Sequence, residues 1–455
     1  MAASLEDEQP VYDLVGVGFG PSNLSLAVAL AEHNAKAVGT DRADVITAHF
    51  VERQPRFGWH RGMLIEDATM QVSFLKDLVT LRNPSSEYSF LSYLHDRGRL
   101  IDFINHKTLF PLRVEFHDYL EWCAARVDDQ VTYGHDVLNI DPVEVDGEVR
   151  YFDIVTHSGG SSDEPLRLRA RNVIMATGLS ANLPDGVTAG ERVWHNSELL
   201  RRVASLDTDA AQRFVVVGAG QSAAETTAFL HERFPRAEVC SVFSRYGYSP
   251  SDDSPFANRI FDPAAVDAYF DAPEPLKQRL MDYHANTNYS AVDLELIEDL
   301  YRRTYREKVL GAQRLRWFNA SRVTEVDAAE DGVRAVVEST ATGARTVLAA
   351  DAIVYATGYR PDESLPQLGE LADRCHRDEL GRPVITRDYR VETDEHIRAG
   401  IYMQGGGTEH THGITSSLLS NNAIRAGEIL RSVLDHRQQE THADRPLEAS
   451  GTRQS

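Results

Sequence analysis

Two short apolar runs along the chain each lead into a glycine-rich turn and then into an apolar stretch with helical spacing. In the first copy, residues 11–17 lead into the turn 16–20 and the stretch 24–33. In the second copy, residues 214–217 lead into the segment 218–225, GAGQSAAE. A strand, a glycine turn and a helix in this order are typical of a dinucleotide-binding βαβ unit. The pattern therefore predicts an α/β chain with two Rossmann-like domains.

The first turn has the residue types that a pyrophosphate needs. Gly16 permits a tight turn, Gly18 lets backbone N–H groups approach the phosphates, and the helix N-terminus adds partial positive charge. Pro21 stands where a third glycine is usual, and proline is tolerated there because its missing N–H would be unpaired in a first helical turn. The next β-rich run ends in Glu52, an acid placed to bind a ribose. The polar insertion 34–44 accounts for its long spacing from the turn.

The second turn differs from the first in the charge that follows it. Ala223 replaces the third glycine and is still small enough for close packing of helix on strand. The next strand, residues 238–243, ends in Ser244 and Arg245 and carries no acid there. A guanidinium can pair with a ribose 2′-phosphate, which an acid would repel. We therefore expect FAD at the first site and NADPH at the second.

Two further strands, at 173–175 and 353–355, each end in Ala-Thr-Gly. Such pairs are typical of flavoproteins with two dinucleotide sites, in which the chain crosses between the FAD and NADPH domains. The FAD domain is therefore expected to be discontinuous, with the NADPH domain inserted into it. The expected division is 1–200 with 350–435 for FAD, 201–349 for NADPH, and 436–455 as a polar mobile tail.

Composition narrows the classes of function. The 455 residues are 42% hydrophobic and 25% charged, which is ordinary globular usage, and the net charge is −22. That charge repels phosphate backbones and anionic lipid, so neither nucleic acid nor a membrane is an expected partner. The acidic N-terminus has no basic or apolar targeting region, and the apolar runs are too short to span a bilayer. We expect a soluble cytoplasmic protein.

The three cysteines restrict the redox chemistry. Cys123, Cys240 and Cys375 are far apart in the sequence, and no CxxC or CxxxxC pair exists. Flavin disulfide reductases also bind FAD and a nicotinamide cofactor, but they need a cysteine pair stacked on the flavin. Its absence leaves oxygen activation or simple electron transfer as the main options.

Nine segments, in order, carry a more specific signal. They are GVGFGPSNLSLAVAL (16–30), FGWHRGM (57–63), MQVSFLKDLVTLRNPSS (70–86), FPLRVEFHDYLEW (110–122), GAGQSAAE (218–225), SDDSPFANRIFDP (251–263), NTNYS (286–290), YATGYRPD (355–362) and GGTEHTHGITSSLLSNNAIRAGEIL (406–430). Together they resemble the N-hydroxylating flavin monooxygenases that act on ornithine or lysine side-chain amines in siderophore biosynthesis. The resemblance covers the chain from Tyr12 to about Leu430.

The resemblance implies which residues meet each ligand. The FAD diphosphate and ribose would be held by Gly16, Gly18, Phe19, Gly20, Pro21, Ser22, Asn23 and Glu52. The flavin would be bordered by Trp59, His60 and Gln71 and covered by Ser417, Leu418 and Leu419. NADPH would meet Ala219, Gly220, Gln221, Ser222 and Asn288, in addition to Arg245. The substrate would contact Lys76, Asn258, Asn288 and Ser420, with Lys76 and Asn288 as catalytic residues and 257–310 as a small helical substrate region.

Physical reasoning supports the substrate residues independently. A zwitterionic amino acid needs a cation for its carboxylate, and Lys76 lies in an apolar stretch that is unusual for a solvated lysine. Asn258 and Asn288 offer neutral donors and acceptors, which can orient an ammonium without a competing negative charge. His410 and His412 form an HxH pair that on a strand would share one face, but no third ligand accompanies them. We therefore expect no metal and assign both rings a packing role near the flavin.

The family's chemistry defines the expected reaction and its alternatives. NADPH would reduce FAD, O2 would add as a C4a-hydroperoxyflavin, and the neutral amine would attack the distal oxygen. L-Ornithine is the expected substrate. L-Lysine is the alternative, because one methylene changes the binding free energy by only about 1–3 kcal/mol. A diamine ranks third, since it has no carboxylate for Lys76. A Baeyer–Villiger-type monooxygenase, suggested by VWHNS at 193–197, and an inactive NADP-binding regulator are the alternatives from other classes. Related enzymes imply a homotetramer.

Overall fold

The first glycine turn lies in a five-stranded parallel sheet. The computed structural model describes residues 10–37, 45–158, 165–361 and 365–443. In spatial order the strands are β19 (Gly400–Met403), β8 (Asn172–Met175), β2 (Leu14–Val17), β3 (Ala48–Glu52) and β4 (Val131–Tyr133). The apolar strands β2 and β19 are buried along their whole length, as expected where both faces of a parallel sheet are covered. Helices α1 (Pro21–Ala37) and α11 (Asn422–Ala443) pack side by side against the sheet.

The second glycine turn lies in a second five-stranded parallel sheet. Its order is β10 (Val193–His195), β17 (Ala352–Tyr355), β11 (Arg213–Val217), β12 (Glu238–Val242) and β13 (Leu315–Phe318). Strands β10 and β17 lie outside 201–349, so the sheet takes one strand from each flank of the segment expected to form the NADPH domain. The reason is packing, because Trp194 and Val354 enter the core beneath helix α6 (Gln221–Arg233).

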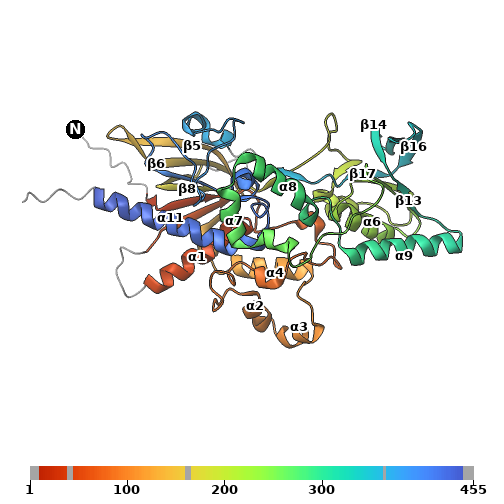
Figure 1. Ribbon diagram of the computed structural model, residues 1–455, viewed down its shortest axis with the longest axis horizontal. Helices are drawn as coiled ribbons and strands as arrows, with labels where there is room; N and C mark the ends of the chain where they lie inside the picture. Colours follow the sequence, from red (N-terminus) through yellow and green to blue (C-terminus); the bar gives the residue numbers. More distant parts are fainter. Residues whose placement is uncertain (1–9, 38–44, 159–164, 362–364, 444–455) are drawn as a thin grey trace, which may run out of the picture.

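An antiparallel unit accompanies each parallel sheet. Beside the first sheet lie β5 (His135–Val145), β6 (Glu148–Ser158) and β7 (Arg167–Ala170), with β1 (Val11–Tyr12) added at the edge. Beside the second lie β14 (Ser321–Ala329), β15 (Gly332–Ser339) and β16 (Arg345–Ala350). Figure 1 shows the result as two strand-rich lobes at opposite ends of the long axis. The two-domain α/β architecture expected from the sequence is confirmed.

Two crossings of the chain join the lobes, and they pair with each other. Directly after the two Ala-Thr-Gly segments, β9 (Leu179–Ala181) and β18 (Tyr359–Pro361) form an antiparallel ribbon. His195 Nε2 donates to the carbonyl oxygen of Gly358 at 2.9 Å, and its ring packs edge-on against Tyr359. The short helix α5 (Leu199–Val203) then leads into the second lobe.

Helices cover the first lobe and extend across to the second. Helices α2 (Phe90–Asp96), α3 (Leu100–His106) and α4 (Arg113–Ala124) share an aromatic core on the first lobe. The segment 257–310 forms a 3₁₀ turn (Ala257–Phe261), α7 (Pro263–Phe270), α8 (Glu274–Asn288) and α9 (Leu294–Leu310), so the helical region expected there is confirmed. Helix α9 lies along the outside of the second lobe in Figure 1.

The C-terminal helix differs from the tail expected from His436 onward. Helix α11 continues to Ala443. Arg390 donates to the ring of His436, and Arg437 donates to the carbonyl oxygen of Val45 at 2.9 Å, so both side chains are held by tertiary contacts that a polar sequence does not reveal. Residues 444–455 lie outside the described residues. Within the described part of the chain, no helix is long and apolar enough to cross a membrane.

One buried ion pair connects the lobes directly. Arg113 on α4 donates to both carboxylate oxygens of Glu225 on α6, at 2.9 and 2.6 Å. Each residue is only 7% exposed. Arg113 also donates to the carbonyl oxygen of Met63 at 3.0 Å, and Gln221 donates to Glu225 at 3.0 Å. The pair therefore fixes α4 of the first lobe against the first turn of α6 in the second.

Neutralising one partner of this pair should destabilise the protein. We expect Glu225→Gln to lower the free energy of unfolding by about 3–5 kcal/mol, because it leaves the Arg113 guanidinium buried without its counter-ion. The double variant Arg113→Met/Glu225→Met removes both charges and should lose less than Glu225→Gln alone. Urea unfolding followed by circular dichroism measures the difference. If the double variant is at least as unstable as Glu225→Gln, the attraction within the pair, and not the unpaired charge, determines the loss of free energy of unfolding.

Candidate active site

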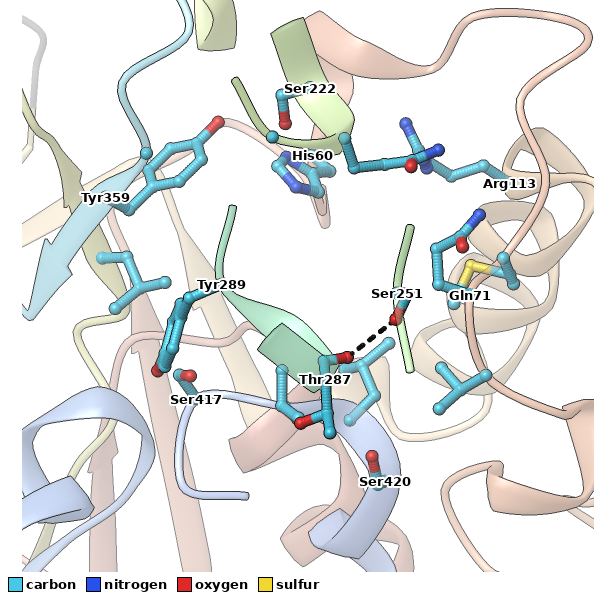
Figure 2. A pocket seen from close by; sticks show the side chains of 18 of the residues that line it. His60, Gln71, Arg113, Ser222, Ser251, Thr287, Tyr289, Tyr359, Ser417 and Ser420 are labelled. Carbon is cyan, nitrogen blue, oxygen red and sulfur yellow. Dashed lines mark hydrogen bonds between the residues drawn. The ribbon is translucent and has the colours of Figure 1, made fainter. Parts of the chain in front are cut away.

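A large cavity lies between the two lobes, and both glycine turns border it. Its volume is about 2280 Å³. Pockets for one small ligand are usually about 300–1,000 Å³, so this cavity has room for more than one. Pro21 and Ser22 reach it from the first turn, and residues 218–222 reach it from the second. Figure 2 shows side chains from both lobes pointing into the same space, including His60, Ser222, Tyr289 and Ser420.

The first turn is built as a dinucleotide turn. Gly18 has φ +81°, and a Cβ there would lie 2.5 Å from the carbonyl oxygen of Ala176, so only glycine fits. The backbone N–H of Phe19 donates to Glu52 Oε2 at 2.6 Å, and Glu52 Oε1 accepts from Gln54 N at 2.9 Å. The acid predicted from the sequence therefore lies directly beside the turn, at the end of β3. A Cβ on Gly20 would meet no atom, which leaves open space at the start of α1.

Several residues predicted to hold FAD act inside the fold and do not line the cavity. Those are Gly16, Gly18, Phe19, Asn23 and Glu52. Gly20 is also outside the lining, but it borders open space. The residues that do line the cavity are Pro21, Ser22, Trp59, His60, Gln71, Ser417, Leu418 and Leu419. A Cβ on Gly16 would collide with the Phe50 ring. The Asn23 amide donates to the Gly18 carbonyl oxygen at 2.7 Å and accepts from Gln404 at 2.9 Å. These two residues shape the turn from behind.

The second turn has an analogous geometry. Gly218 has φ +145°, and a Cβ there would collide with the carbonyl oxygen of Ala356. Ala219, Gly220, Gln221 and Ser222 line the cavity at the start of α6, as does Arg245 beyond the end of β12. One Arg245 nitrogen donates to the Ser290 carbonyl oxygen at 3.0 Å. The guanidinium is thereby held close to the turn, as a 2′-phosphate partner needs to be.

His60 lies between the two lobes in an unusual backbone conformation. Its φ of 55° is left-handed, and its ring packs edge-on against Tyr359 with the centroids 5.7 Å apart. Burial, with the nearby charge of Arg113 and the ring of His195, lowers the pKa of His60 to about 4. The imidazole is therefore neutral near pH 7. Burial also raises the pKa of the Tyr359 phenol to about 12.

Three of the predicted substrate residues, Lys76, Asn258 and Ser420, line the same cavity. Lys76 ends a 3₁₀ turn (Phe74–Lys76), and its ammonium lies 5.6 Å from the ring centroid of Phe261. Among the described residues, none forms an ion pair or a hydrogen bond with this ammonium. Burial lowers the pKa of Lys76, and the charge of Asp262 partly offsets that effect. Asn258 also lines the cavity, and its amide donates to the carbonyl oxygen of Asp253 at 2.7 Å.

Ser420 and Asn288 complete the predicted set. Ser420 lines the cavity with 1% of its surface exposed, and its hydroxyl has no hydrogen-bond partner among the described residues. Asn288 is the last residue of α8, which places its backbone near the cavity-lining Thr287 and Tyr289. The Asn288 side chain lies outside the described parts of the structure. Its predicted contacts therefore remain a proposal.

Sequence reasoning missed one buried cation behind the cavity wall. Arg425, in the first turn of α11, is 2% exposed. Its guanidinium donates to the Ser416 carbonyl oxygen at 2.8 Å, to the Ser22 hydroxyl at 3.4 Å and to Asn422. No carboxylate among the described residues pairs with it, and burial lowers its pKa. The sequence does contain a sign of this residue, because Arg425 lies within the largely apolar stretch 423–430. Lys76 was identified by the same sign, a cation in an apolar stretch.

His410 and His412 lie on a short helix, α10 (Glu409–His412), rather than on a strand. His410 Nε2 donates to the carbonyl oxygen of Pro383 at 2.9 Å, and His412 Nε2 to that of Arg387 at 3.1 Å. The His412 ring stacks on Tyr389 with the centroids 4.0 Å apart. Both rings are thus committed to packing and backbone contacts. Among the described residues, no group of three or more His, Cys, Asp or Glu side chains could hold a metal ion.

Known proteins share this organisation. Residues 10–361 match the family described as L-lysine 6-monooxygenase/L-ornithine 5-monooxygenase. The L-ornithine N(5)-monooxygenase of Burkholderia cepacia is 41% identical over 433 residues, which cover 93% of this chain and 95% of the relative. The structure of the Kutzneria sp. 744 ornithine N-hydroxylase with reduced FAD, NADP+ and L-ornithine has a TM-score of 0.88 and 46% identity, covering 94% of this chain and 100% of the other. The crystal structure of L-lysine 6-monooxygenase from Pseudomonas syringae has a TM-score of 0.81 and 30% identity, and the match covers 93% of this chain and 99% of the other.

The buried state of His412 predicts a specific acid sensitivity. Burial lowers the pKa of His412 from 6.5 to about 3. Above pH 6.5 the ring is neutral in both the folded and unfolded chain, but as the pH falls the unfolded chain takes up a proton that the folded chain refuses. Between pH 7 and pH 4.5 this group should therefore lower the free energy of unfolding by about 3 kcal/mol.

The variant His412→Gln should lack this contribution. Urea unfolding at a series of pH values, compared with the parent chain, isolates it, with His95→Gln at an exposed position as the matched control. Parallel pH curves for His412→Gln and the parent would contradict the prediction.

Proposed function

The chain belongs to the L-lysine 6-monooxygenase/L-ornithine 5-monooxygenase family, and we propose that it converts L-ornithine to N5-hydroxy-L-ornithine with NADPH and O2. It is an FAD- and NADPH-dependent monooxygenase. The observation that carries the substrate assignment is the cavity that joins both dinucleotide turns to Lys76, a lysine that forms no ion pair with any of the described residues. An amino acid bound there would have its carboxylate at Lys76 and its side chain directed toward the redox centre.

The residues present fit an FAD molecule. The first turn leaves open space at Gly20, and the buried side-chain hydroxyls of Ser416 and Ser420 find no hydrogen-bond partner in the described parts of the chain. Such orphaned groups imply a ligand that supplies the missing hydrogen bonds. Pro21 and Ser22 would meet the diphosphate, and Trp59, His60, Gln71 and residues 417–419 would surround the flavin. Reduced by NADPH, bound FAD supplies the activation of O2.

The second turn would hold NADPH. Residues 219–222 present the N-terminus of α6, which favours the pyrophosphate, and Arg245 would pair with the 2′-phosphate. Asn288 at the end of α8 would contact both the NADP ribose and the substrate amine. Neutral His60 can accept or donate one hydrogen bond without adding a charge beside the redox centre.

Substrate recognition would depend on Lys76, Asn258 and Ser420. Lys76 would pair with the α-carboxylate, and the amide of Asn258 and the hydroxyl of Ser420 would orient the zwitterion. The side-chain amine must be neutral to act as a nucleophile, although its pKa in water is about 10.4. Burial disfavours the cation, so the apolar cover of Leu418 and Leu419 would lower that pKa and exclude water.

The biological setting extends the proposal. Hydroxylated ornithine supplies the hydroxamate group of siderophores, and this is the pathway we propose for the product. We also propose a cytoplasmic location and assembly into a homotetramer. The FAD domain would comprise the first lobe and the NADPH domain the second, with 257–310 covering the substrate.

A product assay tests the assignment and the role of Lys76 together. Hydroxylamine formation with L-ornithine should exceed that with L-lysine, putrescine and cadaverine by at least about tenfold in kcat/KM. Lys76→Ala should raise the KM for L-ornithine by about 100-fold, since an ion pair in a partly desolvated site contributes roughly 1.5–3 kcal/mol. Reduction of the flavin by NADPH should proceed at an unchanged rate.

The diamines, which have no carboxylate, provide the matched control. Their KM should not change in Lys76→Ala, so the preference for the amino acid over the diamine should disappear. A preference for L-lysine in the parent enzyme would replace the substrate assignment. An equal loss for L-ornithine and putrescine in Lys76→Ala would show that Lys76 does not read the carboxylate.

Arg425 predicts a second, independent outcome. A buried guanidinium without a carboxylate is costly unless an anion compensates it, and its contact with Ser22 directs it toward the FAD diphosphate. Arg425→Met should weaken FAD binding by at least about tenfold, or 1.4 kcal/mol. Arg425→Lys, which keeps the charge, should retain most of the affinity. Fluorescence titration of the FAD-free full chain with FAD measures both, and equal losses in the two variants would mean that the charge is not what matters.

A further inference from the structure

A buried carboxylate directly follows the lysine of the substrate site. Asp77 is 3% exposed, and no Lys, Arg or His among the described residues pairs with it. Lys76 lines the cavity, whereas Asp77 does not. The two neighbouring side chains therefore have different surroundings, one in the cavity and the other in the interior of the first lobe. Burying an acid is costly unless hydrogen bonds replace those lost to water, so the neighbours of Asp77 must supply them.

Four hydrogen bonds hold the Asp77 carboxylate. Oδ1 accepts from the backbone N–H of Val79 at 3.0 Å and from that of Thr80 at 2.6 Å. Oδ2 accepts from the Thr80 hydroxyl at 2.9 Å and from the backbone N–H of Phe90, the first residue of α2, at 2.8 Å. Burial raises the pKa of Asp77, and these hydrogen bonds partly offset that effect. An ionised carboxylate only accepts hydrogen bonds, so its two oxygens match the four donors.

The carboxylate acts where the chain leaves the 3₁₀ turn that carries Lys76. Within the turn, the backbone N–H of Lys76 donates to the Ser73 carbonyl oxygen at 2.9 Å. At Asp77 the backbone becomes extended, with φ −73° and ψ −170°. The next N–H, that of Leu78, donates to the Tyr119 hydroxyl at 3.2 Å. The hydrogen bonds of Asp77 thus connect this change of direction to the following loop and to α2.

The Lys76 side chain itself has few restraints on the cavity side. Its ammonium lies 5.6 Å from the ring centroid of Phe261, and it is carried by a flexible four-carbon chain. Asp262 also lines the cavity, and its charge already acts on Lys76. A lysine that is free to move would pair with Asp262 and be lost to a substrate carboxylate. The direction of Lys76 therefore depends on how firmly its backbone is held from behind.

We propose that Asp77 is a positioning residue for the substrate, and that its four hydrogen bonds hold the turn in which Lys76 meets the α-carboxylate. Asp77 touches neither substrate nor cofactor and acts through Lys76 alone. This inference rests on the proposed role of Lys76 as the partner of that carboxylate. It adds that selectivity for an amino acid over a diamine requires a buried acid behind the cavity wall.

The variant Asp77→Asn tests the proposal because it keeps the size of the side chain. Its NH2 group must replace one of the oxygens and would face two donors, so two of the four hydrogen bonds are lost. The KM for L-ornithine should rise about tenfold, less than in Lys76→Ala, because a displaced lysine retains part of its interaction. The KM for putrescine, the FAD content and the rate of flavin reduction by NADPH should not change. Equal rises in KM for L-ornithine and putrescine, or no rise, would overturn the proposal.

A double variant tests whether the effect passes through Lys76. In Lys76→Ala/Asp77→Asn the KM for L-ornithine should match that of Lys76→Ala within about twofold, since two residues that act through one group are not additive. A further tenfold rise would show that Asp77 acts by another route, which would refute the inference and leave the proposed reaction intact. If Lys76→Ala alone affects L-ornithine and putrescine equally, the proposed role of Lys76 fails and this inference fails with it.

Milder variants at Thr80 decide the matter even if Asp77→Asn folds poorly. Thr80→Val removes only the hydroxyl donor and should raise the KM for L-ornithine about threefold, with no change for putrescine. Thr80→Ser keeps the hydroxyl and should behave as the parent. Thr156→Val is the matched control, because it removes a buried hydroxyl that donates to the Leu166 carbonyl oxygen from β6 of the same lobe. It should change neither KM. Identical KM values for Thr80→Val and Thr80→Ser would contradict the proposal.

Discussion

The ion pair between Arg113 and Glu225 is the constraint on which the shared site depends. Each lobe folds around its own parallel sheet, so the sheets alone do not determine how the two glycine turns face each other. The buried pair connects α4 of the first lobe to α6 of the second, and Glu225 also accepts from Gln221 at the second turn. Its apparent cost in desolvation is offset by two short hydrogen bonds and by neighbouring carbonyl oxygens. The same guanidinium contributes to keeping His60 neutral.

The local parts of the site could be predicted from the sequence because they depend on short-range rules. A strand, a glycine turn and a helix identify themselves, and Glu52 was found by its place at the end of the next strand. Gly18 and Gly218 do have positive φ and do leave no room for a Cβ. The motif does not distinguish the residues that line the cavity from the residues that only hold the turn in shape. Gly16 and Asn23 belong to the same motif as Ser22, yet they shape the turn from behind while Ser22 reaches the cavity.

The long-range parts could not be predicted from a single sequence. Strands β10 and β17 join the second sheet because their apolar side chains complete the core beneath α6, and no local pattern records that pairing. The end of α11 behaves similarly, since residues 436 and 437 are held by Arg390 and by the backbone of Val45. The ribbon of β9 and β18 follows the Ala-Thr-Gly segments, but only the structure shows that the two crossings pair.

The roles proposed for Lys76 and Arg425 would allow a strongly acidic protein to select anionic ligands. Both are cations in apolar stretches, and neither has a carboxylate partner among the described residues, although the chain contains 69 acidic residues. A paired cation would have to exchange its partner for each ligand, whereas an unpaired one gains the whole interaction on binding. The two differ in position, since Lys76 faces the cavity and Arg425 lies behind its wall. The cavity-facing position of Lys76 suits a substrate that is bound and released in each turnover. The buried position of Arg425 suits a cofactor that stays bound.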